Sequence, residues 1–174
     1  MTSPARFVSA WVTVSDRRTC LEWEQKWGVS ALHDVTNLYN WFELVSDYPT
    51  PSWITQVNQE RFGGHGDWRV PASAGPPWDP TGHLPELESV MTVPCPGDPT
   101  ACIDPAFGPF PVNAGGCDPT YCNPDHPVYW SVSADPGSPA YAWAVDFVNG
   151  NWLYSRKRFY LWYVRAVRGS LYGE

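Results

Sequence analysis

The chain has 174 residues, of which 43% are hydrophobic and 17% are charged, and its net charge is −7. This length and composition are typical of one globular domain that buries its own core, so we expect residues 1–174 to form a single domain. The negative charge argues against nonspecific binding to nucleic acid, and the lack of an apolar run of roughly 18 residues argues against membrane insertion.

The first predicted elements are strands near the start of the chain. Alternating apolar residues in "FVSAWVTVS" predict one strand over 7–15, and residues 17–27 continue through a turn into a second extended segment. The start has no clean cleavage site, so we interpret it as a strand rather than as a signal peptide. The sequence leaves the localisation open, although the cysteines discussed below favour a virion or cell surface.

Two short helices are predicted further along the chain. Residues 50–62 carry apolar side chains at helical spacing, with Thr50 as the expected N-cap, Pro51 at the first position and Gly63–Gly64 as the stop signal. Residues 84–91 predict a second, shorter helix.

The middle of the chain is rich in turn residues and cysteines. Sixteen of the nineteen prolines lie within residues 71–139, which predicts long ordered loops. Four of the five cysteines lie there too, namely Cys95, Cys102, Cys117 and Cys122. Two short-range disulfides, Cys95–Cys102 and Cys117–Cys122, are favoured over a zinc site. In a four-cysteine zinc site the two cysteines of each pair are usually separated by about two to four residues, and Cys95 and Cys102 are too far apart for this spacing. Free thiols remain the third alternative.

The last part of the chain predicts strands over residues 128–133, 142–150 and 163–169. Asn149–Gly150 is a hairpin signal between two extended segments. The side chains expected in the core of these strands are those of Trp130, Trp143, Val164 and Val167.

Residues 151–169, "NWLYSRKRFYLWYVRAVRG", concentrate aromatic and basic side chains. They hold five of the eleven basic residues, which are Arg156, Lys157, Arg158, Arg165 and Arg168. A half-buried strand should alternate apolar and polar residues. Here the even-numbered and the odd-numbered positions each contain both kinds, so neither face of such a strand would be purely apolar or purely polar. Tyr, Trp and Arg are enriched at interface hot spots. The composition therefore favours an exposed binding surface over a buried strand.

No motif in the chain predicts catalysis or metal binding. Asp67 and Arg69 of "DWRVP" fit a pair that holds a loop, because one carboxylate beside one arginine specifies no reaction. The four histidines lack ligand spacing, and Asp104 and Asp118 lack a close run of further oxygen ligands. We therefore expect no enzymatic activity, no cofactor and no bound metal.

A family resemblance rests on eight motifs that occur in order along the chain: "TVSDRRTCLEWEQKW", "SALHDVTNLYNW", "GGHGDWRVP", "PELESVM", "CIDPAFGPF", "YWSVS", "AYAWAVDFVNG" and "YVRAVRG". Over nearly its whole length the chain resembles the collagen-like adhesin C-terminal domain family, a branch of the C-type lectin-like fold. The resemblance implies an α+β fold with two short helices, small antiparallel sheets and long ordered loops, in which the N- and C-terminal strands pair. Formylglycine-generating enzymes share the broader fold and use a cysteine pair near the C-terminus, but no cysteine follows Cys122.

Some members of this family are diversified by retroelements just before the final "VRAVR" strand, on either side of a fixed lysine. Lys157 stands where that lysine would be. The resemblance thus implies a ligand-binding variable region at about residues 129–168. Its expected contact residues are Trp152, Leu153, Tyr154, Ser155, Arg156, Arg158, Phe159, Tyr160, Leu161, Trp162, Asp135, Tyr141 and Asp146.

Two functional hypotheses follow from the patch and the resemblance. The first is a variable protein of a diversity-generating retroelement, which binds a protein or cell-surface ligand through the diversified residues. The alternative is a fixed lectin-like adhesin domain that binds sulfated glycans through the basic cluster. Exposed aromatic clusters also favour self-association, so an oligomer is compatible with either function.

Overall fold

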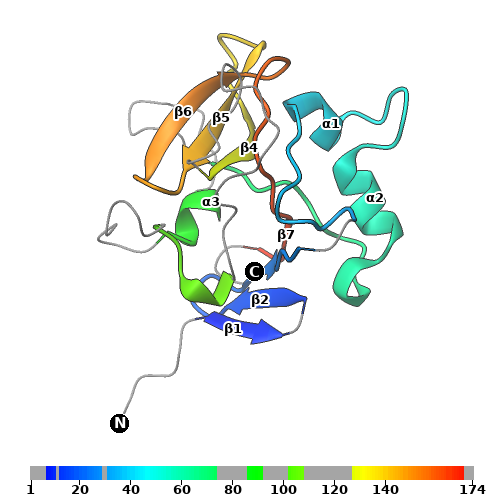
Figure 1. Ribbon diagram of the computed structural model, residues 1–174, viewed down its shortest axis with the longest axis vertical. Coiled ribbons are helices and arrows are strands. Elements are labelled where there is room, and N and C mark those ends of the chain that lie inside the picture. Colours follow the sequence, from blue (N-terminus) through cyan, green and yellow to red (C-terminus); the bar gives the residue numbers. More distant parts are fainter. Residues whose placement is uncertain are drawn as a thin grey trace.

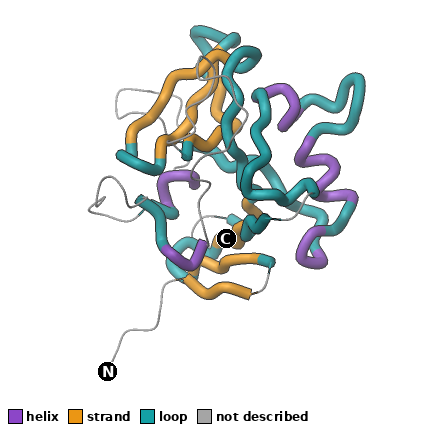
Figure 2. The backbone as a smooth tube through the Cα atoms, in the orientation of Figure 1, coloured by secondary structure: helices purple, strands orange, loops and turns teal. Residues whose placement is uncertain are grey.

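The computed structural model describes residues 7–10, 12–28, 31–73, 86–91, 102–107 and 127–170 (Figure 1). These residues form an α+β structure with two small antiparallel sheets and three short α-helices. The sheets lie at opposite ends of the structure, and two of the helices lie along one side (Figure 2). The α+β class predicted from the sequence is therefore confirmed, with one more helix than expected among the described residues.

The first sheet has the strand order β1-β2-β3-β7. Its strands are β1 (Phe7–Ala10), β2 (Thr13–Asp16), β3 (Leu21–Glu24) and β7 (Val167–Arg168). The single strand predicted over residues 7–15 is a hairpin instead, in which Ala10 pairs with Thr13. The prediction was wrong because apolar alternation continues through the reversal, and no Gly or Asn marks the turn.

The predicted pairing of the N- and C-terminal strands is also wrong in detail. The last strand, β7, pairs with β3, so that Trp23 lies opposite Val167. The first strand, β1, lies at the other edge of the same sheet. The end of the chain therefore joins the free edge of β3, and the outer edge of β1 stays unpaired among the described residues.

The helices are α1 (Trp41–Val45), α2 (Trp53–Gln59) and α3 (Glu86–Ser89). Helix α1 was not predicted from the sequence. It begins with a capping box: the Asn40 side chain accepts from the Glu43 backbone, and the Glu43 side chain accepts from the Asn40 backbone. This Asn-x-x-Glu pattern is a local start signal, and it would have predicted the helix.

The two predicted helices are present but shorter than expected. The N-cap of α2 is Ser52, whose hydroxyl oxygen accepts from the backbone N–H of Thr55 at 3.3 Å, so the expected roles of Thr50 and Pro51 were wrong. Asp47 further fixes this cap by accepting from the Ser52 backbone N–H at 2.8 Å. A 3₁₀ turn, η1 (Phe62–Gly64), follows α2 where the stop was predicted.

The second sheet is antiparallel with the strand order β4-β5-β6. Its strands are β4 (Val128–Ala134), β5 (Tyr141–Asp146) and β6 (Asn151–Arg156). The turn between β5 and β6 contains Gly150 at a φ of 74°, a conformation that suits glycine, as the hairpin signal predicted. The hairpin of β5 and β6 forms the outer edge of the molecule at the end away from β1 and β2 (Figure 1).

The segment that follows β6 crosses between the two sheets. Its backbone bonds first to residues near α1 and β4, where Trp162 exchanges two hydrogen bonds with Tyr39 and the N–H of Tyr163 donates to Val128. It then reaches the first sheet, where the Ala166 carbonyl accepts from Glu24. Only Val167–Arg168 of the strand predicted over residues 163–169 is therefore regular strand.

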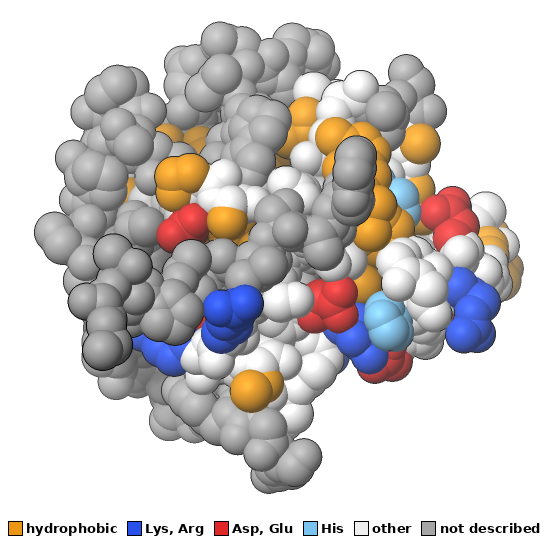
Figure 3. Space-filling view, turned by 90° about the horizontal axis from the view of Figure 1, so that it is seen from below, with side chains coloured by type: hydrophobic (Ala, Val, Ile, Leu, Met, Phe, Trp, Pro, Cys, Tyr) orange, Lys and Arg blue, Asp and Glu red, His pale blue; other side chains and the backbone are white. Residues whose placement is uncertain are grey.

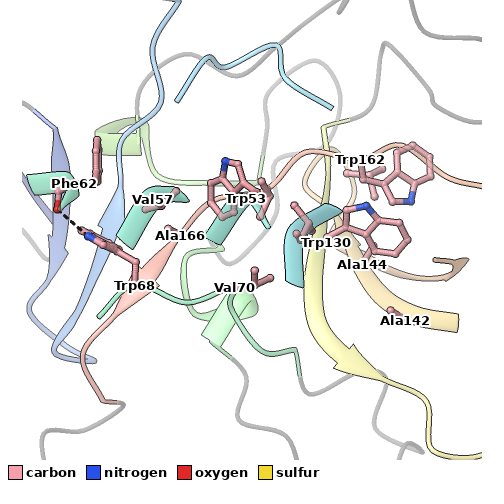
Figure 4. Packing of buried hydrophobic residues seen from close by; sticks show 13 residues of the cluster. Trp53, Val57, Phe62, Trp68, Val70, Trp130, Ala142, Ala144, Trp162 and Ala166 are labelled. Carbon is pink, nitrogen blue, oxygen red and sulfur yellow. Dashed lines mark hydrogen bonds between the residues drawn. The ribbon is translucent and has the colours of Figure 1, made fainter. Parts of the chain in front are cut away.

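The core lies between these elements. Trp53 and Val57 of α2 pack with Trp130 of β4 and with Ala142 and Ala144 of β5, and Figure 4 shows these side chains together between the helix and the sheet. A second cluster, which contains Trp23, Phe107, Tyr129, Phe147 and Val167, joins the first sheet to β4 and β5. Val164 is buried as well. The predicted core positions Trp130, Val164 and Val167 are confirmed.

Candidate functional site

The β5–β6 hairpin turns one face toward the core and the other toward solvent. Ala142 and Ala144 of β5 and Ser155 of β6 are buried. The alternate side chains form the outer face of the hairpin, which comprises Tyr141, Trp143, Trp152, Tyr154 and Arg156. Val145 lies opposite Trp152 on the same side but is buried, so this side faces solvent mainly at the end near Tyr141 and Arg156. The sequence pattern mixed apolar and polar residues on both faces, but burial alternates over residues 141–144 and 153–156. Residue polarity does not reveal this alternation, because a small polar serine points inward and amphipathic aromatic rings point outward.

Three aromatic rings of the outer face contact one another, two of them stacked and the third tilted by 43°. Tyr141 and Tyr154 lie face to face, with ring centroids 4.4 Å apart and planes 9° from parallel. Trp143 lies directly across from Tyr154 in the strand register, with the ring centroids 5.0 Å apart. The guanidinium of Arg156 lies 5.5 Å from the Tyr141 ring centroid, and its Nε–H donates to the Tyr141 hydroxyl at 2.7 Å. Cross-strand pairs of this kind hold exposed rings in one geometry.

Asp135, in the turn after β4, holds the outer end of this stack. The hydroxyl of Tyr154 donates to one carboxylate oxygen of Asp135, and the backbone N–H of Gly137 donates to the other at 2.8 Å. The bond from Tyr154 and the bond from Gly137 lower the pKa of Asp135. Desolvation and this carboxylate raise the pKa of Tyr154. Asp135 therefore remains ionised and fixes the direction of the Tyr154 ring.

Lys157 anchors the loop that follows β6. It is buried, and its ammonium lies 4.0 Å from the ring centroid of Trp41. Its backbone N–H donates to Ala140, and its carbonyl accepts from the backbone N–H of Trp41, both at 3.0 Å. Burial lowers the pKa of the Lys157 ammonium. The lysine thus ties the loop to α1 on one side and to the start of β5 on the other.

A shallow cavity of about 360 Å³ opens where this loop meets α1 and β5. We name it the arginine hollow, and its lining residues are Phe42, Ala140, Tyr141, Arg156, Arg158 and Phe159. Phe42 and Phe159 are 41% and 51% exposed, so two of its walls present aromatic surface to solvent. Arg158 lies over Phe42, with its guanidinium carbon 6.0 Å from the ring centroid.

The structure divides the predicted contact residues into three groups. The exposed ones are Trp152, Tyr154, Arg156, Arg158 and Phe159. The partly buried ones are Asp135, Tyr141, Leu153, Tyr160 and Leu161. The buried ones are Asp146, Ser155 and Trp162.

The three buried residues correct the predicted set. The indole N–H of Trp162 donates to the Ser155 hydroxyl at 3.2 Å, and both side chains lie beneath the hairpin. Asp146 accepts from the backbone N–H of Val148 at 2.8 Å and shapes the turn after β5. These side chains support the outer face from within, because they have almost no surface of their own.

The predicted basic cluster is largely part of the scaffold. Lys157 and Arg165 are buried, and Arg165 donates to the Glu24 carbonyl at 2.5 Å. Arg168 forms ion pairs with Glu22 at 2.6 Å and with Asp67 at 2.9 Å. Only Arg156 and Arg158 of the five are exposed.

Charges of both signs lie beside each other at the other end of the molecule, which Figure 3 shows from below. The residues of the "DWRVP" motif take part in such pairs, although not with each other. Asp67 binds Arg168, and Arg69 binds Glu86 of α3. The predicted pair of Asp67 with Arg69 is therefore wrong, because each residue forms its ion pair with a residue distant in the sequence.

Sequence reasoning missed two residues of the site. Trp143 was expected in the core but is only partly buried and stacks on Tyr154. The alternation of large Tyr141 and Trp143 with small Ala142 would have indicated its outward direction. Phe42 comes from the unpredicted α1, and no local signal links it to residues more than a hundred positions away.

Several predictions concern the cysteines, metals and membranes. Cys95, Cys117 and Cys122 lie outside the described residues, so the disulfide pairings stay predictions, and the buried Cys102 has its sulfur 3.1 Å from the Val148 carbonyl oxygen. Cys20 is the one free cysteine of the described segments.

The described segments contain no group of three or more His, Cys, Asp or Glu side chains that could hold a metal ion. No helix in them is long and apolar enough to cross a membrane.

Comparison with known proteins gives no identity. No protein-family model, no curated protein and no solved structure matches the chain. The outer face and the arginine hollow therefore carry the functional inference by their own geometry.

Proposed function

We propose that this protein is a recognition module that binds a protein or cell-surface ligand through the outer face of the β5–β6 hairpin and the adjoining arginine hollow. The observation that carries the proposal is the cluster of three rings, Tyr141, Trp143 and Tyr154, of which Tyr154 is exposed and the other two are partly exposed, on a hairpin whose inner face is core. Rings held on paired strands lose little conformational entropy on binding, and Tyr, Trp and Arg supply most hot-spot energy at interfaces.

The proposal includes diversification of this surface by a retroelement. Outward side chains such as Tyr154 and Arg156 alternate with inward Ser155 and Lys157, so these outward positions can change without removing a core contact. Lys157 is the buried anchor of the loop, which is a physical reason to keep it fixed. The resemblance to the collagen-like adhesin C-terminal domains, and with it the C-type lectin-like fold, belongs to the same proposal.

A sulfated-glycan adhesin is the second candidate function. The exposed Arg156 and Arg158 favour it, since guanidinium groups bind sulfate well. Burial or ion pairing removes the other three cations from this surface, and two exposed cations make a weak electrostatic site for a polyanion. The protein ligand is therefore the favoured partner.

The binding proposal can be tested with selected ligands. Phage-displayed random peptides are selected on the immobilised protein. The affinity of the selected peptides is then measured for the wild type and for the double variant Tyr141→Ala/Tyr154→Ala. We expect about a hundredfold loss of affinity, since two hot-spot rings are removed. The matched control is Tyr48→Ala, because Tyr48 is 89% exposed but lies on the loop between α1 and α2. Selected peptides that bind the double variant as well as the wild type would contradict the proposal.

Diversification has a test of its own in the neighbouring DNA. A near-copy of the codons for residues 151–168 that differs mainly at adenines, beside a reverse-transcriptase gene, is the expected finding. If the neighbouring DNA holds neither, the fixed adhesin domain becomes the better account, while the binding surface itself still stands.

A further inference from the structure

The arginine hollow combines apolar walls with two cations at its rim. Phe42 comes from α1, Tyr141 from β5 and Phe159 from the loop after β6, so three separate elements supply the aromatic lining. Its volume of about 360 Å³ lies near the lower limit of ligand-binding pockets. A space of this size accommodates one or two side chains rather than a large ligand.

The two arginines of the rim are available for an incoming anion. Arg156 is held in place, because its Nε–H donates to the Tyr141 hydroxyl and its guanidinium lies 5.9 Å from the Phe159 ring centroid. Among the described residues, none bonds to the two terminal amino groups of Arg156, which can therefore contact a ligand. Neither Arg156 nor Arg158 has a carboxylate partner among the residues that the structure describes, although the chain carries a net charge of −7. The local positive charge therefore favours an acidic ligand.

The lining fits a peptide better than a saccharide. A sugar needs several fixed polar groups for its hydroxyls, whereas this lining offers the two guanidinium groups and one tyrosine hydroxyl. The hydroxyl of Tyr141 already accepts from Arg156. An apolar side chain between the rings of Phe42 and Phe159 would bury aromatic surface that is now exposed.

We infer that the arginine hollow binds an acidic peptide segment, with one apolar side chain inserted between the aromatic walls and the flanking carboxylates paired with Arg156 and Arg158. This inference rests on the proposed recognition function and names the chemistry of its partner. Bidentate contacts between guanidinium and carboxylate would fix the register of the segment, and the apolar insertion would supply the buried area. The outer face would then contact the remainder of the same partner protein.

Three terminally blocked pentapeptides and one saccharide test the inference on the full chain. The peptides have the central sequences Glu-Leu-Glu, Gln-Leu-Gln and Glu-Ala-Glu, and the saccharide is a sulfated heparin disaccharide. NMR titration follows the arginine Nε–H signals and the backbone amides. We expect Glu-Leu-Glu to shift the signals of Arg156, Arg158 and Phe42, and to bind about tenfold more tightly than either other peptide.

Charge-matched variants separate local contacts from the net charge. Arg158→Gln should lower the affinity for the Glu-Leu-Glu peptide by about tenfold and leave the affinity for the Gln-Leu-Gln peptide unchanged. Arg17→Gln removes the same charge from the exposed turn between β2 and β3, and it should change neither affinity.

The outcomes that would overturn the inference are distinct from failure of the proposed function. Equal binding of the Glu and Gln peptides, or tighter binding of the disaccharide, would show that the acidic-peptide assignment is wrong. The recognition function would survive either result if phage-selected ligands still required Tyr154. Loss of both the peptide shifts and the Tyr154 dependence would remove the function and the inference together.

Discussion

Two regions of the molecule use charged side chains for opposite purposes. Around Glu24, in β3, charged groups are buried and paired: the carboxylate lies 2.8 Å from the Lys26 ammonium and 2.6 Å from His33 Nδ1. On the outer face and in the arginine hollow, the guanidinium groups of Arg156 and Arg158 are exposed and lack a carboxylate partner in the described residues. Burial and pairing, not residue type, therefore separate the groups that hold the fold from those that can bind a partner.

The largest expected effect lies in the buried region. Glu24→Gln should lower the free energy of unfolding by about 3–5 kcal/mol, because the Lys26 charge would remain buried without its counter-ion. Urea denaturation followed by tryptophan fluorescence measures the change. Glu22→Gln is the matched control on the same strand, and its half-buried pair with Arg168 should contribute about 1 kcal/mol or less. Similar losses in both variants would mean that the two regions do not differ as described.

The pH dependence of stability sharpens the same contrast. Burial alone would raise the pKa of Glu24, but Lys26 and His33 outweigh it, so the pKa is lowered from its ordinary value of 4.5. A carboxyl with a depressed folded-state pKa stabilises the protein above its unfolded-state pKa, and this contribution is lost as the pH falls through the folded-state value. The stability difference between wild type and Glu24→Gln should therefore be constant above about pH 5 and shrink on further acidification. A difference that stays constant throughout would contradict the assignment to Glu24.

Neighbouring residues in the loop after β6 provide the next test. Lys157→Ala removes the buried side chain together with its packing on the Trp41 ring, and it should cost about 1–2 kcal/mol. Arg158→Ala, one position later, truncates an exposed side chain and should leave the denaturation midpoint almost unchanged. Urea midpoints of both variants give the comparison. The reverse order of effects would make Arg158, and not Lys157, the anchor.

The sequence predicted elements with local signals better than it predicted which side chains face solvent. The hairpin at Asn149–Gly150 and the helix within residues 84–91 have such signals and are present. The direction of the patch could not be predicted, because inward Ser155 and Lys157 are polar while outward Tyr154 is aromatic.

Local sequence patterns could not predict the arginine hollow either. It forms because the Trp41 backbone bonds to the Lys157 carbonyl, which brings α1 beside the patch. Contacts between residues so distant in sequence depend on the whole fold and leave no periodic signal. The basic cluster was overestimated for a related reason, since the partner of Arg165 is a backbone carbonyl in β3.

Apart from the control variants, the smallest expected effect on stability is at Tyr154 itself. Tyr154→Leu removes a ring that is 41% exposed, together with its stack on Tyr141 and its bond to Asp135, and should lower the free energy of unfolding by less than about 1 kcal/mol. The same variant should lose most of its affinity for the phage-selected ligands. A loss of stability as large as that of Glu24→Gln would instead make the stack a structural element. A surface that the fold needs cannot be diversified freely, so that result would also exclude retroelement variation at this position.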